Sequence, residues 1–205
     1  FPYTVGYGMT ECGPAIAFDH WQTFRPTSCG RAVDRMEIRI DSPDPFKQVG
    51  EILTKGMNVM DGYYNNPEAS NTVLSPNGWL HTGDLGVLDP DGYLYIKGRS
   101  KSLILGPSGQ NIYPEEIEDL LNAQPYIAES LVIEREGKLV ALVYPDAEAM
   151  KQNKISREAL LKIIHETRKQ INQQLPAYSQ IARIEIHDEE FEKTPKRSIK
   201  RFLYQ

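Results

Sequence analysis

The sequence has little of what marks secreted, membrane-spanning or metal-binding proteins. Its 205 residues include 2 cysteines, too few for a disulfide framework, and 4 histidines that lack metal-ligand spacing. No apolar run approaches the roughly 18 residues of a membrane-spanning helix, and no N-terminal signal pattern occurs. We therefore expect a reduced, cytoplasmic protein.

The charge balance also excludes a class of partner. With a formal net charge of −5 and a pI near 5.5, a broad electrostatic attraction to nucleic acid is not expected. Basic side chains nevertheless gather in residues 192–201, which read EKTPKRSIKR. The chain opens FPYTVGYGMTE without a starting methionine, and we expect it to be a piece of a longer protein.

The first hundred residues predict a β-rich body. Clusters of β-forming residues between Gly, Pro and Asp indicate short strands spaced as in a small barrel or sandwich. A short helix is expected from Pro67, because proline suits the first helical position. The expected strands cover residues 36–40, 50–56 and 92–98.

Beyond Lys101 the pattern changes to alternating helix and strand, which predicts a compact α+β domain. Pro114 opens one expected helix, and Ser156 caps a second whose apolar residues follow helical spacing. A strand pair is expected around Gly137. The expected helices cover residues 113–124 and 156–175, and the expected strands cover residues 129–136, 138–145 and 181–188.

Three short motifs are candidate sites, each with a structural alternative. GYGMTE at residues 6–11 offers glycines, a ring and a carboxylate, but glycine-flanked tyrosines are also common at strand ends. GWLHTGDLG at residues 78–86 places Asp84 in what reads as a polar turn, which that side chain could merely stabilise. The Gly/Pro/Ser loop within residues 98–118 could admit a ligand or simply connect a hairpin.

Taken in order, these motifs, together with GEILTKGMNVMDGYYNNPEAS, GYLYIKGRSKSLIL and GQNIYPEEIE, resemble the later motifs of the adenylate-forming (AMP-binding) superfamily. Acyl-CoA synthetases, peptide-synthetase adenylation domains and luciferases belong to it. The resemblance runs from residue 6 to about residue 201, and its wording is most similar to bacterial long-chain fatty acid–CoA ligases. It implies that residues 1–100 end a large AMP-binding domain and that residues 101–205 form a small mobile domain with a short sheet flanked by helices.

The resemblance implies a two-step reaction. A carboxylate attacks the α-phosphate of ATP to give an acyl adenylate and pyrophosphate, and a thiol, usually coenzyme A, then displaces AMP. The implied cofactors and substrates are ATP or AMP, Mg²⁺, coenzyme A and a carboxylic acid. Charge-rich transition states of this kind call for magnesium and a cation near the α-phosphate.

The resemblance also assigns expected roles to individual residues. Tyr7, flanked by Gly6, Gly8 and Met9, would stack on adenine; Thr10 would contact the α-phosphate and Glu11 would hold Mg²⁺. Asp84 would bind the ribose hydroxyls, Arg99 would lie near the ribose and phosphate, and Ile96 would line the nucleotide pocket. Lys101 would be the hinge between the domains, and Ser108 and Gly109 would line the tunnel for the pantetheine arm.

The basic segment departs from the family pattern, which ends Pro-x-Thr-x-x-Gly-Lys-(Ile/Val)-x-Arg. Aligned through Thr194, Arg197 replaces the glycine and Ser198 replaces the catalytic lysine. If the segment is extended, Ser198 and its neighbours two positions away project to one side, and Lys200 or Lys196 would supply the cation. A lost or altered first half-reaction, or a merely solvated tail, are the alternatives.

A second departure is that the family's early phosphate-binding loop occurs nowhere in the sequence. We therefore expect the chain to need the missing N-terminal part as its partner and to be inactive alone. The alternatives are an enzyme that loads a carrier protein, a nucleotide-binding or regulatory module without chemistry, and a structural or docking segment. Glu11, Asp84, Arg99 and Lys101 favour the enzyme. Peripheral membrane contact through an acyl substrate stays an alternative to a purely cytoplasmic location.

Overall fold

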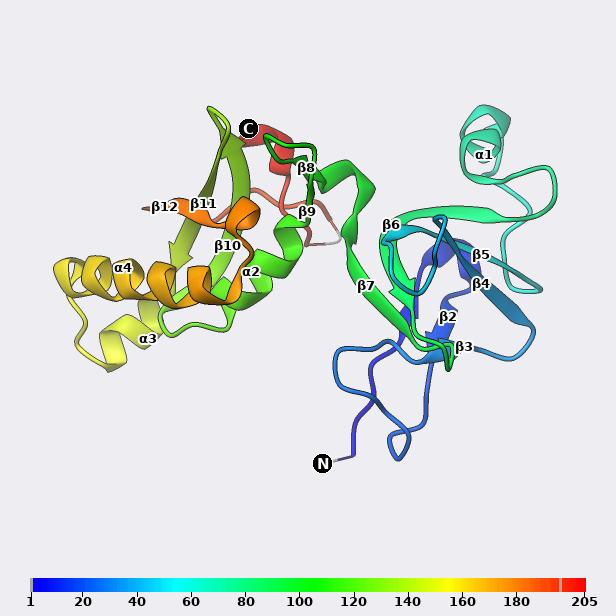
Figure 1. The fold of residues 1–205 in the computed structure, drawn as a ribbon, viewed down its shortest axis with the longest axis horizontal. Helices are drawn as coiled ribbons and strands as arrows, with labels where there is room; N and C mark the ends of the chain where they lie inside the picture. Colours follow the sequence, from blue (N-terminus) through cyan, green and yellow to red (C-terminus); the bar gives the residue numbers. More distant parts are fainter. Residues whose placement is uncertain (1, 196) are drawn as a thin grey trace. The chain divides into compact units, whose positions relative to one another are not determined.

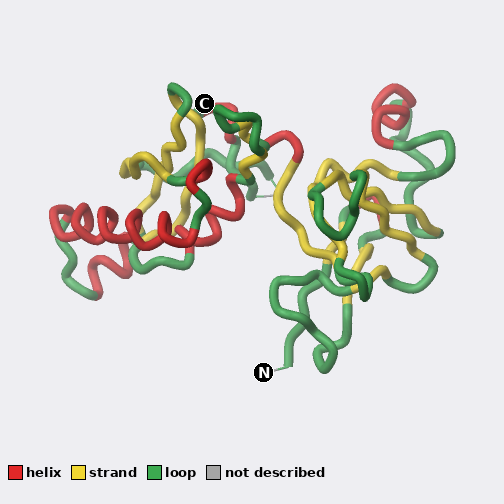
Figure 2. Tube along the Cα trace, viewed as in Figure 1, coloured by secondary structure: helices red, strands yellow, loops and turns green. Residues whose placement is uncertain are grey.

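The computed structural model describes residues 2–195 and 197–205. The chain divides into two compact units, Phe1–Lys101 and Ser102–Gln205 (Figure 1). The division falls where the strand-rich pattern of the sequence gives way to helices. Strand and loop dominate the first unit, whereas the second carries most of the helix (Figure 2). The candidate cation Lys196 lies outside the described residues.

The larger sheet of the first unit is an antiparallel meander whose order, β4-β5-β6-β7, follows the chain. Three of its strands confirm those expected from sequence. The last of the three begins only at Leu94, because a turn precedes it in which the Gly92 N–H donates to the Asp89 carbonyl over 2.9 Å. The strands are β4 (Met36–Asp41), β5 (Gly50–Gly56), β6 (Leu80–Leu88) and β7 (Leu94–Arg99).

A smaller sheet of order β1-β2-β3 packs against the larger one. Ala17 of this sheet joins the buried side chains of Ile40, Ile52 and Leu94 in one apolar cluster, which removes the facing side chains of the two sheets from water. The described residues thus form two packed sheets and not a closed barrel. The strands of the smaller sheet are β1 (Tyr7–Gly8), β2 (Ala15–Phe18) and β3 (Arg31–Ala32), with a 3-10 turn, η1 (Thr10–Cys12), after the first.

Asp84 lies inside strand β6 and not in a turn, so that sequence interpretation was wrong. Three residues of β6, 82–84, oppose Ile52 alone on β5, which makes this stretch a bulge. Gly83 adopts φ 72° there, a left-handed conformation that favours glycine. The polar bulge therefore reads as a turn in sequence although the ladder continues on both sides.

The helix expected from Pro67 is α1 (Pro67–Val73). Its N-terminus is capped by Asn66, whose side chain accepts a hydrogen bond from the Ala69 N–H. This cap satisfies one of the amide groups that a helix start leaves without an intrahelical partner.

The second unit is built on a three-stranded mixed sheet of order β10-β11-β12. The first two strands are antiparallel and turn at Gly137, whereas β12 runs parallel to β11 after a helical crossover. The strands are β10 (Ile127–Arg135), β11 (Lys138–Pro145) and β12 (Ile181–Ile186), all confirming expected strands. The helices are α2 (Pro114–Asn122), α3 (Ala147–Gln152) and α4 (Arg157–Gln174), of which the first and last were expected.

Alternate side chains of this sheet enter two different cores. Val132, Ala141 and Val143 pack with apolar residues of α2 and α4, whereas Leu131 and its alternating neighbours pack with Phe191 of the C-terminal segment. The period of two in a strand produces this division. Helices thus cover one face and the C-terminal segment covers the other, which is the α+β architecture expected.

A short hairpin, β8 (Ile104–Leu105) and β9 (Asn111–Ile112), precedes α2. The Gly106 N–H donates to the Gln110 carbonyl over 2.8 Å across its loop, so the Gly/Pro/Ser stretch is a hairpin connection. It follows η2 (Ser100–Ser102), and η3 (Ala177–Ser179) precedes β12. No helix in the described part of the chain has the length and apolar character needed to cross a bilayer.

The basic segment near the C-terminus reverses direction, so the condition of one extended segment is not met. Lys193 and Ile199 are antiparallel bridge partners, and the Thr194 N–H donates to the Ser198 carbonyl over 2.8 Å. The Lys200 N–H donates to the Glu192 carbonyl over 2.8 Å and closes the loop. The described residues 192–195 and 197–200 are called the terminal hairpin below; η4 (Arg201–Leu203) follows it.

Candidate active site

The carboxylate of Asp84 is the centre of the polar groups in the first unit. Its side chain is buried, accepts a 2.7 Å hydrogen bond from the Tyr7 hydroxyl and pairs with the Arg99 guanidinium over 3.1 Å. Arg99 is the register partner of Asp84 across β6 and β7. A carboxylate offers about four lone-pair sites, so these two contacts leave acceptor capacity for the hydroxyls of a ligand.

Tyr7 remains a neutral donor in this arrangement. Burial raises the pKa of the Tyr7 phenol above its ordinary value, and the nearby charge of Asp84 raises it further, because both disfavour the phenolate. The hydroxyl therefore keeps its proton and fixes the direction in which the ring lies.

The Arg99 side chain is held at its Nε but is otherwise exposed. Its side chain is 71% exposed although its Nε contacts the buried Asp84. The remaining guanidinium N–H groups form a fork that suits a phosphate. Ile96, also on β7, is exposed.

The bulge that carries Asp84 is supported by Glu51, a residue that the sequence did not indicate. The Gly83 N–H donates to Glu51 Oε1 over 3.0 Å, and Glu51 Oε2 contacts His81 Nδ1 over 2.8 Å. One carboxylate thus contacts both the centre of the bulge and the residue that precedes it. His81 also contacts Ser75 over 3.1 Å, which makes it a structural residue here.

The motif at residues 6–11 forms β1 and the start of η1. Gly8 must be glycine, since a Cβ there would lie 2.1 Å from the Pro14 carbonyl oxygen. Gly6, Gly8 and Thr10 are exposed, whereas Met9 is half-buried and packs against the core of the unit.

Glu11 contacts Tyr63, which the sequence analysis missed. The Tyr63 hydroxyl donates to Glu11 Oε1 over 2.9 Å; burial, then this hydrogen bond and the Glu11 charge, raise the pKa of the phenol. In the part of the chain that the structure describes, no three His, Cys, Asp or Glu side chains gather as a metal cluster. A single carboxylate still fits Mg²⁺, which binds through one or two carboxylates plus phosphates and water.

Lys101 and the loop residues Ser108 and Gly109 are all exposed. Lys101 is in η2, at the end of the first unit. Ser108 and Gly109 belong to the β8–β9 loop, where Gly109 adopts φ 79°.

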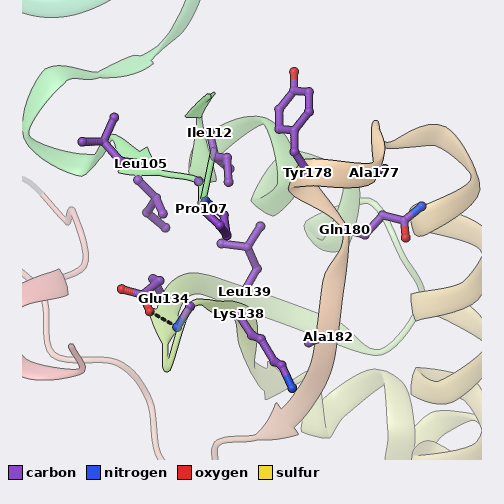
Figure 3. Close-up of a pocket in the computed structure, with 13 residues that line it drawn as sticks. Leu105, Pro107, Ile112, Glu134, Lys138, Leu139, Ala177, Tyr178, Gln180 and Ala182 are labelled. Carbon is purple, nitrogen blue, oxygen red and sulfur yellow. Dashed lines mark hydrogen bonds between the residues drawn. The ribbon is translucent and has the colours of Figure 1, made fainter. Parts of the chain in front are cut away.

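The loop that holds Ser108 and Gly109 borders a pocket of about 380 Å³ in the second unit (Figure 3). Its first residues, Gly106 and Pro107, line the pocket together with the strand residue Leu139. Tyr178 and Lys138 add a ring and a cation, so the pocket can accept a ligand that has both apolar and anionic parts.

The candidate cation Lys200 is held by Glu192. Its Nζ lies 3.1 Å from Glu192 Oε2, and its side chain is 34% exposed. Ser198, which occupies the position of the family lysine, is exposed. Arg197, which occupies the position of the family glycine, adopts φ 63°, the left-handed conformation that explains why a glycine belongs there.

A buried carboxylate with spare acceptor capacity, next to an exposed guanidinium and a ring, is suited to a sugar diol beside a phosphate. The class of site is therefore a candidate nucleotide site. Comparison with known proteins agrees: residues 2–64 match the family described as AMP-binding enzyme, and residues 101–204 match the AMP-binding enzyme C-terminal domain. The chain belongs to this adenylate-forming family.

Relatives in the family are CoA ligases for different acids. The chain is 38% identical over 172 residues to a 2-succinylbenzoate–CoA ligase of Bacillus cereus, covering 80% of the chain and 35% of that enzyme. It is 40% identical over 129 residues to a long-chain-fatty-acid–CoA ligase of Escherichia coli, covering 60% of the chain and 23% of that enzyme. The chain thus spans about a third or less of the length of these relatives.

Solved structures agree with the fold. The O-succinylbenzoate coenzyme A synthetase of Bacillus subtilis, in complex with ATP and magnesium ion, superposes with a TM-score of 0.79 at 30% identity. The match covers 98% of this chain and 41% of that protein.

Proposed function

We propose that this chain is the C-terminal portion of an ATP-dependent acid–thiol ligase. The ligase joins a carboxylic acid to the thiol of coenzyme A through an acyl adenylate. The observation that carries the proposal is the buried carboxylate of Asp84, held between Tyr7 and Arg99 at the end of a fold that AMP-binding enzymes share.

In the first step the acid oxygen forms a bond to the α-phosphorus of ATP, and the bond to the pyrophosphate oxygen breaks. Asp84 accepts the ribose hydroxyls, Tyr7 offers its ring to adenine, and Arg99 lies against the ribose and phosphate. Gly6, Gly8 and Met9 shape the adenine side, Ile96 lines the pocket, and Thr10 contacts the α-phosphate. Glu11 would hold Mg²⁺, which when bound offsets the charge of the phosphate oxygens.

In the second step the thiol sulfur forms a bond to the acyl carbon, AMP leaves with the electron pair, and the thiol proton passes to solvent. The loop with Ser108 and Gly109 borders the path of the pantetheine arm, and Lys101 is the hinge about which the second unit turns between the steps. In this proposal residues 1–100 are the end of the large domain, and residues 101–205 are the small mobile domain.

The cation of the first step is Lys200 in this proposal. Lys200 is attached to the body of the second unit, next to Arg201, and its contact with Glu192 joins two exposed or half-exposed side chains, which is a weak pairing in water. A nucleotide phosphate can therefore replace Glu192. Lys196 is the alternative cation.

The acid is a long-chain fatty acid in this proposal, because the sequence of residues 104–118 resembles that of bacterial long-chain fatty acid–CoA ligases. The relatives include ligases named for both kinds of acid, 2-succinylbenzoate and long-chain fatty acids. An aryl acid is therefore the alternative substrate. A carrier-protein thiol is the alternative to coenzyme A. Ser198 favours a second candidate function, a nucleotide-binding module without chemistry, since a serine supplies no charge.

Acid-dependent exchange of pyrophosphate into ATP tests the proposal. It is measured in the longer protein that contains this chain, with a panel of fatty and aryl acids. Exchange with a fatty acid supports the full proposal. Exchange with aryl acids alone supports the ligase but changes the proposed substrate from a fatty acid to an aryl acid. Binding of AMP without exchange for any acid favours the module. The 205-residue chain itself should release no pyrophosphate, and acid-dependent release by it would contradict the assignment as a portion.

A further inference from the structure

Two acidic groups on the body of the second unit contact the base of the terminal hairpin. Arg201, directly after the hairpin, places its guanidinium 2.5 Å from Glu118 Oε2 and 3.5 Å from Glu115 Oε1. Its side chain is 19% exposed and that of Glu118 is 11% exposed. A pair this shielded is far less screened by salt than a surface pair.

The same pair is bound to one backbone position on β10. Glu118 Oε1 accepts a 2.6 Å hydrogen bond from the Val132 N–H, and Arg201 Nη1 donates to the Val132 carbonyl over 3.3 Å. Helix α2, strand β10 and the hairpin base are thus closed into one ring of contacts. An arginine suits this place because its planar fork donates to two acceptors at once.

The start of the hairpin is fixed to the same strand. Lys193 Nζ lies 2.6 Å from Glu129 Oε1 of β10 and 2.5 Å from Glu190. Lys193 and Arg201 therefore form structural contacts, whereas among the described residues the Lys200 ammonium has the weak pair with Glu192 alone. The division separates cations that hold the hairpin from the cation that the reaction can use.

Aromatic packing also holds the terminal hairpin against the second unit. Tyr204 packs edge-on against Phe191 at 5.2 Å between ring centroids, and its hydroxyl accepts a 2.8 Å hydrogen bond from the Glu192 N–H. Phe191 is buried in the core beneath the sheet. The two ends of the hairpin are thereby joined to each other as well as to β10.

We propose that Arg201 and Glu118 are a positioning pair that sets the direction in which the terminal hairpin presents its reactive cation to the α-phosphate. The inference rests on the proposed function for its catalytic part. Neither residue touches the nucleotide. The pair serves adenylate formation in this inference, because that is the step to which the proposed function assigns the cation.

The test uses the longer protein with Arg201→Ala, Arg201→Lys, Glu118→Gln and the double variant. Arg157→Ala is the matched control, since Arg157 also forms a two-bond pair, with Asp188, on the same unit but on its exposed surface. Two half-reactions are measured separately: pyrophosphate exchange, and transfer of the acyl group from supplied acyl adenylate to the thiol.

We expect Arg201→Ala and Glu118→Gln each to lower kcat for exchange at least tenfold, with KM for ATP and the transfer rate within twofold. Arg201→Lys should fall between, and the double variant should be no worse than Arg201→Ala, as for residues that act as one unit. The control should stay within twofold in both half-reactions. Equal losses in both half-reactions, additive losses, or unchanged exchange would overturn the inference.

A readout without activity separates the two proposals. Trypsin cleavage after Arg197 of the longer protein, followed by mass spectrometry, should be at least fivefold faster in Arg201→Ala and unchanged in Arg157→Ala. If the longer protein shows no exchange with any acid, the proposed function fails. The cleavage rate then still tests whether the Arg201–Glu118 pair holds the terminal hairpin in place. An unchanged cleavage rate in Arg201→Ala would overturn the positioning role.

Discussion

The hydroxyl of Tyr7 donates a 2.7 Å hydrogen bond to Asp84, which lies 77 residues further along the chain. The bond joins β1 of the small sheet to the bulge of β6 in the large sheet. A hydrogen bond to a charged acceptor contributes about 1.5–3 kcal/mol. The residues proposed to hold the nucleotide therefore also hold the two sheets of the first unit together.

Asp84→Asn should weaken AMP binding by the longer protein about 10- to 100-fold, the equivalent of about one hydrogen bond to a charged group. The amide replaces one acceptor oxygen by a donor and removes the charge opposite Arg99. Isothermal titration calorimetry measures the change. Asp91→Asn is the matched control, because Asp91 pairs with Arg25 at the exposed surface of the same unit. Equal affinity in the wild type and Asp84→Asn would rule out the ribose contact.

Tyr7→Phe should change the pH dependence of stability on the alkaline side. Burial and then Asp84 raise the pKa of Tyr7 in the folded chain, so folding binds its proton more tightly. The resulting stability is complete below the ordinary tyrosine pKa of about 10 and is lost as the pH rises above it. The free energy of unfolding should thus fall less steeply above pH ~10 in Tyr7→Phe than in the wild type.

Urea unfolding at several alkaline pH values measures this difference. Tyr64→Phe is the control, since the Tyr64 side chain is 91% exposed, and it should follow the wild-type curve. Parallel curves for Tyr7→Phe and the wild type would contradict the buried, neutral phenol.

Lys200→Ala should lower pyrophosphate exchange at least a hundredfold in the longer protein. Removing one charge-assisted contact to a transition state costs about 3 kcal/mol or more, and Ser198 supplies no charge in its place. Lys151→Ala, on the exposed side of α3, is the control. A Lys200→Ala protein with full exchange would move the cation to Lys196, and Lys196→Ala would then carry the loss.

Arg197→Gly should raise the stability of the second unit by about 0.5–1 kcal/mol. Arg197 adopts φ 63°, a conformation that costs an L-residue about 1–2 kcal/mol, and glycine returns part of this as chain entropy in the unfolded state. Denaturation followed by helical circular dichroism reports on the second unit, which carries most of the helix.

Ser198→Gly is the matched control next door, because Ser198 does not have a positive φ. It should lower stability by up to about 1 kcal/mol. Stabilisation by both substitutions, or by neither, would show that backbone strain at residue 197 is not the cause.

The longer elements could be predicted from the sequence, and the reasons are local. Helix α4 has both a capping serine, Ser156, whose side chain accepts from the Ala159 N–H, and an apolar stripe at helical spacing. Strands β10 and β11 have apolar residues on both faces and a glycine between them. These signals need no knowledge of the rest of the fold.

The short and irregular elements could not be predicted. β1 and β3 are two residues each, too short for any periodic pattern, and β6 hides its continuity behind the bulge at Gly83. The terminal hairpin depends on contacts with Glu129 and Glu118, which lie far away in sequence. An extended segment was the default in the absence of those contacts.

For the site, the sequence could indicate Asp84, Arg99 and Tyr7 only through family motifs, and the structure brings these three side chains together. Glu51 and Tyr63 were missed because nothing in their own neighbourhood marks them. Each acts through a contact with a residue 30 or more positions away. The roles of Tyr7, Asp84 and Arg99 in nucleotide binding remain predictions, as do the roles of Thr10, Glu11 and Lys200.

The ring of contacts at Val132 also has a consequence for folding in the cell. β10 is an edge strand, and Arg201, which binds the Val132 carbonyl, is made 69 residues later. At about 5–20 residues per second, the ribosome leaves that carbonyl uncovered for roughly 3 to 14 s. An open strand edge invites pairing with another chain. This edge of β10 is therefore open to such pairing during the interval, which ends when Arg201 is made.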